Sequence, residues 1–416
     1  MNLLRTRSWR RAACFASVPL LATFISSAVA AQLDGRFSLS KEKYLAGEPV
    51  FLSFTVKNAG NQPVRIRTAD PLSFCGGYGF KVAGVRDREA LPCGRSGFGG
   101  SCASSDVVLA PGESRTDRIL LNARFDLRLP GNYSLQVKHR VVYGGADETL
   151  AALASGKVFQ DFETEQQILI ASGTEDEIQP EYAQYARVLD SADFHTKLEA
   201  ARVVAYMAPK FMEPTILKML GTPALQIYGV EGLRSLGTSS AHRALAEYIK
   251  NAPPTNVLGP YQTALRYIGE IGDEGDIPLL IEVALANAPD SSSREIAIES
   301  AGKLGGAAAI PALSAELADP SIDTRQAAVR ALYLTGSRAA VPVLIGLLQS
   351  PEWRVSLTAE YGLEVLTHRS GATTTSMKPP PPDTYSKWMR WWKEHGETAT
   401  IFKTDLCGKA APLPSL

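Results

Sequence analysis

The sequence predicts a multidomain β + α protein, in which a β-sandwich is followed by an α–α solenoid. Three features of the 416-residue chain support this prediction. Residues 36–172 contain short runs of alternating polar and apolar side chains separated by turn-forming residues, the pattern of half-buried strands. Residues 175–368 contain a repeat of 31 to 33 residues, and a period of this length is typical of stacked helix pairs. Residues 1–30 contain four arginines and no acidic residue near their start, followed by an apolar stretch.

The repeat is clearest in three segments that share a glycine, four residues, an aliphatic residue, a proline and an apolar helical run. They are GDEGDIPLLIEVA (272–284), GGAAAIPALSAEL (305–317) and GSRAAVPVLIGLL (336–348). Proline suits the first position of a helix, because the amide hydrogen that it lacks would have no partner there. Each unit is therefore expected to contain a first helix that begins at the proline, a polar turn and a second helix. We expect about six such pairs between residues 175 and 368.

An arginine recurs at the start of the second helix of the clear units, as Arg294, Arg325 and Arg354. Two of them follow aspartates closely, so we expect these arginines to bond turn carbonyls and aspartates between units. The pattern resembles the HEAT repeat, specifically the short bacterial units first associated with phycobilisome lyases, and is clearest over residues 271–367. The resemblance implies an architecture rather than an activity. Those lyases attach bilins to cysteines inside photosynthetic cells, a setting that an exported protein with a β domain does not fit.

The β region shows a strand pattern in VFLSFTV (50–56), where Val50, Leu52, Phe54 and Val56 would face a core. The alternate residues, including Phe51, would face the other way. The segment AGEPVFLSFTVKNAGNQPV (46–64) resembles the start of many bacterial immunoglobulin-like domains. In PGNYSLQV, Tyr133 follows a Pro-Gly turn at the start of a strand. This placement is similar to a tyrosine corner, whose hydroxyl bonds nearby backbone. The resemblance implies an immunoglobulin-like sandwich over residues 36–172 that acts as a spacer or an adhesive surface.

The N-terminal segment predicts export. Basic residues, an apolar stretch and the small residues Ala28-Val29-Ala30 fit a secretory signal peptide over residues 1–30. A membrane anchor is the competing interpretation, but the apolar stretch is short for a bilayer span. The expected location is periplasmic or secreted, with no membrane span in the mature chain. Without the leader the chain would carry 39 basic against 43 acidic residues, which predicts no nucleic-acid partner.

Four cysteines would remain in the mature chain, and an even number in an exported protein favours disulfides. The preferred pairing joins Cys93 to Cys102 within a glycine-rich stretch. Cys75 and Cys407 would then tie the C-terminal tail to the β domain. A zinc site is the alternative, but the spacing lacks paired CxxC elements.

The tail begins with a proline-rich linker at residues 369–382, which contains four consecutive prolines. Residues 383–416 then carry a short helix, with Asp383 as its N-cap and Tyr385, Trp388 and Trp392 on one stripe. We expect this helix to cover the apolar end of the last repeat, because a terminal repeat must be capped. Aromatic rings that grip a peptide or a sugar are the alternative.

The sequence contains no recognisable catalytic, metal-binding or cofactor motif. We therefore predict no enzyme, no metal site and no cofactor, and a scaffold or adaptor that binds a protein or peptide on the concave face of its solenoid. The candidate binding residues lie on two second helices: Glu295, Glu299, Gln326, Arg330 and Tyr333. The alternatives are an accessory or inhibitor protein acting through the β-sandwich and a hydrolase with a site at the domain junction. A polar pocket holding His139 or His195 near an acid would favour the hydrolase.

Overall fold

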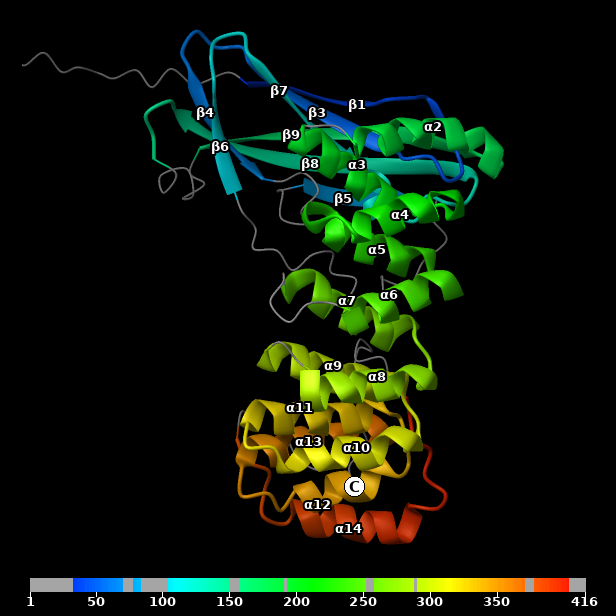
Figure 1. The fold of residues 1–416 in the computed structure, drawn as a ribbon. Helices are drawn as coiled ribbons and strands as arrows, with labels where there is room; N and C mark the ends of the chain where they lie inside the picture. Colours follow the sequence, from blue (N-terminus) through cyan, green and yellow to red (C-terminus); the bar gives the residue numbers. More distant parts are fainter. Residues whose placement is uncertain are drawn as a thin grey trace, which may run out of the picture.

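The computed structural model describes residues 33–69, 78–83, 104–149, 158–190, 193–251, 258–287, 290–370 and 378–403. Figure 1 shows a β region at one end of the molecule and a column of stacked helices that leads away from it to the C-terminal helix α14. The predicted leader (1–30) and all four predicted disulfide cysteines (Cys75, Cys93, Cys102 and Cys407) lie outside the described residues. Among the described helices, none is long and apolar enough to cross a membrane.

The β region consists of two sheets. A three-stranded antiparallel sheet has the order β1-β3-β7, and a larger sheet has the order β2-β9-β8-β4-β6, with β5 also paired to β8. β2 pairs with β9 in parallel, and the other pairs are antiparallel. The strands are β1 (Leu33–Leu39), β2 (Lys43–Leu45), β3 (Phe51–Asn58), β4 (Val64–Ala69), β5 (Tyr78–Ala83), β6 (Ser104–Leu109), β7 (Ser114–Leu120), β8 (Gly131–Gly145) and β9 (Phe159–Ala171).

The two sheets share a buried core. Leu52 of β3 belongs to the same apolar cluster as Leu135 of β8 and Ile168 of β9, which come from the other sheet. The alternation predicted for β3 is confirmed, since Val50, Leu52, Phe54 and Val56 are all buried. The predicted tyrosine contact is also present: the hydroxyl of Tyr133 donates to the carbonyl of Leu129 at 2.6 Å.

The first helix pair packs on the outer side of the smaller sheet. Phe51 was expected to face outward, yet it is buried, because with Leu120 it joins the apolar core of the helical region. The hydroxyl of Tyr182 on α2 donates to the carbonyl of Gly47 at 2.7 Å, and Arg118 of β7 forms an ion pair with Glu199 on α3. The outer face of β3 is thus part of the interface between the β region and the helices.

Six helix pairs follow in the described residues, as the repeat predicts. The pairs are α2 (Glu175–Val188) with α3 (Phe194–Met207), α4 (Glu213–Leu220) with α5 (Gln226–Leu236), α6 (Ser239–Asn251) with α7 (Leu258–Ile271), α8 (Ile277–Glu282) with α9 (Ser291–Leu304), α10 (Ile310–Ala315) with α11 (Ile322–Leu334), and α12 (Ala340–Leu347) with α13 (Trp353–Thr367). The first helices begin slightly before the prolines: α8 and α10 start one residue earlier, at Ile277 and Ile310. Pro278 and Pro311 still lie in the first turn, where no amide donor is needed.

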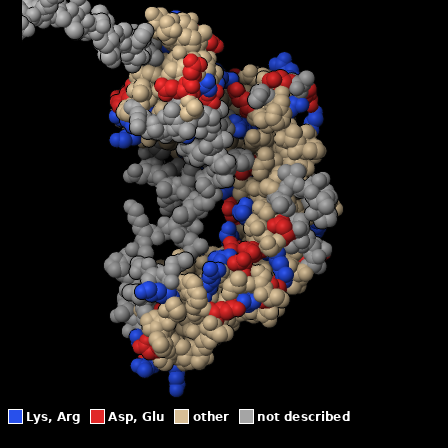
Figure 2. Space-filling view, turned by 90° about the vertical axis from the view of Figure 1, so that its left-hand side faces the viewer, with Lys and Arg blue, Asp and Glu red and all other residues tan. Residues whose placement is uncertain are grey.

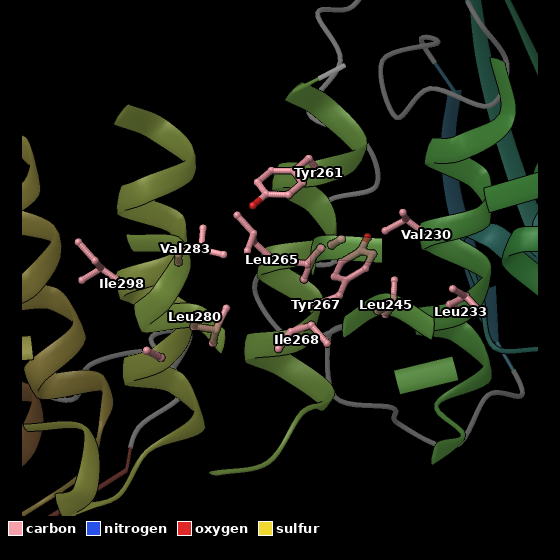
Figure 3. Close-up of a cluster of buried hydrophobic side chains, with 14 of the residues drawn as sticks. Val230, Leu233, Leu245, Tyr261, Leu265, Tyr267, Ile268, Leu280, Val283 and Ile298 are labelled. Carbon is pink, nitrogen blue, oxygen red and sulfur yellow. The ribbon is translucent and has the colours of Figure 1, made fainter. Parts of the chain in front are cut away.

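Aliphatic side chains between neighbouring pairs form one continuous core along the column. Figure 3 shows part of it, where Leu265 and Ile268 of α7 lie between Leu245 on one side and Leu280 and Val283 on the other. The second helices approach each other closely. A Cβ atom at Gly302 of α9 would lie only 2.4 Å from the carbonyl oxygen of Ala331 on α11, so only glycine fits there.

The tail closes the column with α14 (Thr384–His395), which packs against α12. Asp383 occupies the N-cap position without a side-chain capping bond and instead pairs with Lys387 at 2.8 Å. The predicted aromatic stripe is partly different: the buried rings are Trp388 and Trp391, while Tyr385 and Trp392 remain partly exposed. The side of α14 that faces the core therefore carries Trp388 and Trp391, which lie three residues apart on adjacent turns.

Candidate binding surface

The second helices form a continuous layer, because α3, α5, α7, α9, α11 and α13 pack against one another in that order. In Figure 1 this layer lies behind the first helices. Figure 2 shows that the helical region is curved and that acidic and basic side chains line its hollowed side. We call the solvent-facing side of the second-helix layer the inner face.

One equivalent position on every second helix faces solvent. In α3, α5, α7 and α9 it lies six residues before the residue that follows the helix. In α9, α11 and α13 it lies nine residues after the N-cap, so α9 connects the two rules. None of its six occupants is buried, whereas the residue just before it is buried throughout. The occupants, which we call the inner row, are Arg202, Glu231, Arg266, Glu299, Arg330 and Tyr361. The charge therefore alternates along five consecutive repeats.

Two predicted binding residues belong to this row and bond to each other. Nε of Arg330 on α11 donates to Oε1 of Glu299 on α9 at 2.5 Å, and both side chains are about one-third exposed. The contact links helices of successive repeats. A partner that binds here would meet an ion pair rather than two separate charges.

Tyr333, another predicted binding residue on α11, is only 5% exposed. Its ring lies against Gly362 of α13, where a side chain would collide with it, and meets the ring of Tyr361 edge-on at 5.8 Å. Tyr333 is therefore a packing residue between repeats. Tyr361, 41% exposed, is the aromatic ring that this end of the inner face offers to solvent.

Glu295 and Gln326 are partly exposed on the same face, one turn before Glu299 and Arg330. Burial raises the pKa of the Glu295 carboxyl, and the nearby carboxylate of Asp323 raises it further, while Arg330 opposes the shift. Asp323 is exposed at the start of α11. This part of the inner face therefore has a locally negative potential.

Similar contacts link neighbouring second helices in the part of the inner face that lies nearer the β region. Nε of Arg202 donates to the hydroxyl of Tyr228 at 3.2 Å, and Arg234 pairs with Glu270 at 2.8 Å. Burial raises the pKa of the Glu231 carboxyl, although a hydrogen bond from the Tyr267 hydroxyl partly opposes this effect. Carboxylate, guanidinium and phenol groups of successive repeats thus bond to one another in this part of the inner face.

The recurring arginines have the structural role expected for two of the three. Arg294 pairs with Asp319 at 2.8 Å and with Glu316 at 3.0 Å, both from the following unit. Arg325 donates to the carbonyls of Asp319 and Pro320 in its own turn and pairs with Glu352 of the next unit. Arg354 differs, since it is exposed and lies 5.7 Å above the ring of Trp353.

His139 and His242 both have structural partners. His139 stacks on Tyr78 with ring centres 3.7 Å apart and meets Phe54 edge-on, inside the β region. His242 bonds Asp276 at 2.7 Å, and that aspartate also accepts from the backbone of Asp273 at a helix start. The side chain of His195 is not among those described. Within the described part of the chain, no group of three or more His, Cys, Asp or Glu side chains could hold a metal ion.

The helix pairs can be compared with known repeat families. Residues 310–364 match the family model of HEAT repeats. This segment covers α10 to α13, the last two HEAT-like units of the column. No curated protein matches the sequence.

Several solved structures are similar to part of this chain at low sequence identity. An engineered protein is 20% identical, with 44% of this chain and 95% of that chain covered and a TM-score of 0.30. The complex of CpcE and CpcF of phycocyanin lyase from Nostoc is 19% identical, with 52% and 82% covered and a TM-score of 0.28. YibA of E. coli is 17% identical, with 47% and 77% covered and a TM-score of 0.32.

Three charged members of the inner row, Arg202, Glu231 and Arg266, were not predicted from the sequence. A signal for them exists, because each lies six residues before Ala208, Gly237 or Gly272, the same spacing that separates Glu299 from Gly305. The upstream units are too divergent for the proline pattern to align them. Only the ends of the helices put the units in register.

Proposed function

We propose that this chain is a non-catalytic scaffold that holds an extended segment of a protein partner along its inner face. The observation that supports the proposal is the inner row, a solvent-facing line of polar side chains on six successive second helices. Each unit of a HEAT-like stack contacts only its neighbours, which leaves such a line continuous and accessible. Its alternating sign suits a polypeptide that carries both charges. A nucleic acid would meet Glu231 and Glu299 as like charges.

Two places on the inner face carry charged side chains that form no ion pair with another described residue. Arg266 on α7 is exposed and forms no ion pair with another described residue. Glu295 on α9, one repeat further along, and Asp323 on α11, two repeats further along, supply acidic groups. We therefore expect the partner to place a carboxylate near Arg266 and a basic side chain near Glu295. Charged contacts of this kind set register and association rate more than affinity.

Site-specific crosslinking would test the proposal. A photo-reactive amino acid at position 266 should give a discrete adduct with the partner in living cells, whereas the same group at the exposed Arg243 on α6 should not. The charge reversal Arg266→Glu should weaken capture about tenfold, since a lost contact of about 1.4 kcal/mol changes an equilibrium constant by that factor. Arg243→Glu is the matched control and should bind as the wild type does. Equal adducts from both positions would contradict the assignment of the inner face.

We also propose that the β region is an immunoglobulin-like domain and that the protein is exported and stabilised by disulfides. The bond from Tyr133 to Leu129 supports the first part, since it has the form of a tyrosine corner. The basic and apolar N-terminus and the even number of remaining cysteines support the second. N-terminal sequencing should find the mature chain beginning near Ala31, and mass mapping without reduction should find bridged cysteines. Four free thiols in the exported protein would refute the disulfides.

A further inference from the structure

The last second helix, α13, differs from the others at one core position. The residue just before the inner row is a buried aliphatic residue in four successive second helices: Val230, Leu265, Ile298 and Val329. Figure 3 shows three of them, Val230, Leu265 and Ile298, among the buried side chains between repeats. In α13 the corresponding residue is Glu360, which is only 2% exposed. A carboxyl group therefore occupies a position that is apolar elsewhere in the stack.

Glu360 belongs to a stripe of buried polar side chains along α13, with Ser356, Glu364 and Thr367 one or two turns away. The other three have hydrogen bonds: Ser356 to the carbonyl of Trp353, Thr367 to that of Leu363, and Glu364 from the hydroxyl of Ser370. The Oε1 atom of Glu360 is buried and accepts no hydrogen bond from the described residues. A buried carboxyl oxygen without a partner disfavours the ionised form most strongly.

The tail covers this end of the stack and has unpartnered polar atoms of its own. On α14, Oγ1 of Thr384 and Nε1 of Trp388 are buried and have no hydrogen-bond partner in the part of the chain that the structure describes. Ser356 of α13, Tyr385 of α14 and the prolines 379–382 line one cavity of about 520 Å³, so the three segments meet there. Among the described residues, buried polar atoms on both α13 and α14 thus lack hydrogen-bond partners.

The charges around Glu360 are few. Burial raises the pKa of its carboxyl to about 7; the carboxylate of Glu364 on the same helix adds to this rise, and Lys387 on α14 opposes it. The other helix against α14, α12, carries no titratable side chain. On α11, which packs against the opposite side of α13, Arg330 is bonded to Glu299 and Tyr333 is buried. The balance at Glu360 thus depends on one acid, one base and the degree of burial.

We propose that α14 is a pH-sensitive cap, docked most firmly when Glu360 is protonated and loosened when Glu360 ionises. When α14 undocks, the carboxyl meets water and regains its ordinary pKa, so the docked state binds the proton more tightly. Docking is then strongest below about pH 4.5, weakens as the pH rises to about 7 and levels off above that. Undocking exposes to solvent the apolar end of the stack that Trp388 and Trp391 cover. The cap thereby controls access to a second, apolar surface distinct from the inner face.

Hydrogen exchange in the full-length protein measures this equilibrium directly, because protection factors report local opening. After correction for intrinsic exchange, protection of α14 amides should fall on the order of 100-fold between pH 4.5 and 7, since each unit of pKa difference is a factor of ten. Protection of α9 should stay constant and serves as the internal reference. In Glu360→Gln the α14 profile should become flat.

Two more variants make the outcome decisive. Glu394→Gln removes an exposed carboxyl from α14 itself and should keep the wild-type profile. Glu360→Leu restores the aliphatic residue type of the earlier repeats and should hold α14 protected at every pH, also if the glutamine variant folds poorly. Constant α14 protection in the wild type, or a wild-type profile in both Glu360 variants, would overturn the proposal.

Discussion

Replacing Gly302 with alanine should lower the free energy of unfolding by about 3 kcal/mol, near the upper end for an overpacked core. The added Cβ atom would lie 2.4 Å from the carbonyl oxygen and 2.6 Å from the Cα atom of Ala331. These are backbone atoms of a packed helix, so α11 as a whole would have to move away from α9. Because neighbouring repeats stabilise one another, the displacement would weaken the C-terminal units together. Chemical denaturation followed by circular dichroism measures the loss.

Gly346 provides the matched control. It lies within α12, is exposed, and a Cβ atom there would meet nothing within 4 Å. Gly346→Ala should therefore stabilise the protein by about 0.5–1 kcal/mol, since alanine loses less backbone entropy in a helix. The two substitutions are chemically identical, so opposite signs would isolate the close approach of α9 and α11. A destabilisation of similar size in both would mean that helix contacts are not the cause.

Replacing Trp388 with alanine should cost about 3–5 kcal/mol and release the cap from the last repeat. Trp388 is fully buried in the core shared with α12 and α13, and its ring meets that of Trp391 edge-on at 5.7 Å. The loss should appear as rapid hydrogen exchange in α14 and a lower thermal midpoint. A destabilisation that left α14 as protected as before would contradict a capping role.

Met389→Ala serves as the control for this experiment, because the neighbouring side chain is 41% exposed on the other side of the same helix. Its removal should change the free energy of unfolding by less than about 0.5 kcal/mol. The comparison separates the burial of one ring from the helix propensity of α14. If both variants lost equal stability, the contact with α12 would not hold the cap in place.

Much of the helical region could be predicted from the sequence because its signals are local. Glycine, proline and aliphatic spacing predicted where pairs begin, and the helix starts at Ile277 and Ile310 differ by only one residue from the prediction. The strand that contains Leu52 and Phe54 was recognised for the same reason, since alternation depends only on neighbours in sequence. The outer residue of that strand, Phe51, was misplaced because α2 and α3, more than a hundred residues later, cover it.

The candidate surface was predicted in part. Glu299 and Arg330 were placed on one face by helical spacing, but their bond joins residues 31 positions apart and depends on how closely α9 and α11 stack. Tyr333 shares that face on a single helix, and no local pattern shows that Gly362 of the next repeat leaves room for its ring. Exposure of a solenoid side chain is decided by the neighbouring unit.

The sequence by itself determined the order of the two regions, the number of helix pairs and, to within one or two residues, where the first helices of the clear units begin. The reason is that backbone propensities and apolar periodicity act within a single unit. Only the tertiary structure decided which polar groups remain available. Tyr333 became core, Glu299 and Arg330 became an ion pair between units, and Glu360 was buried near Lys387 of α14. The physical reason is that burial and charge pairing depend on distances between units, which no single unit encodes.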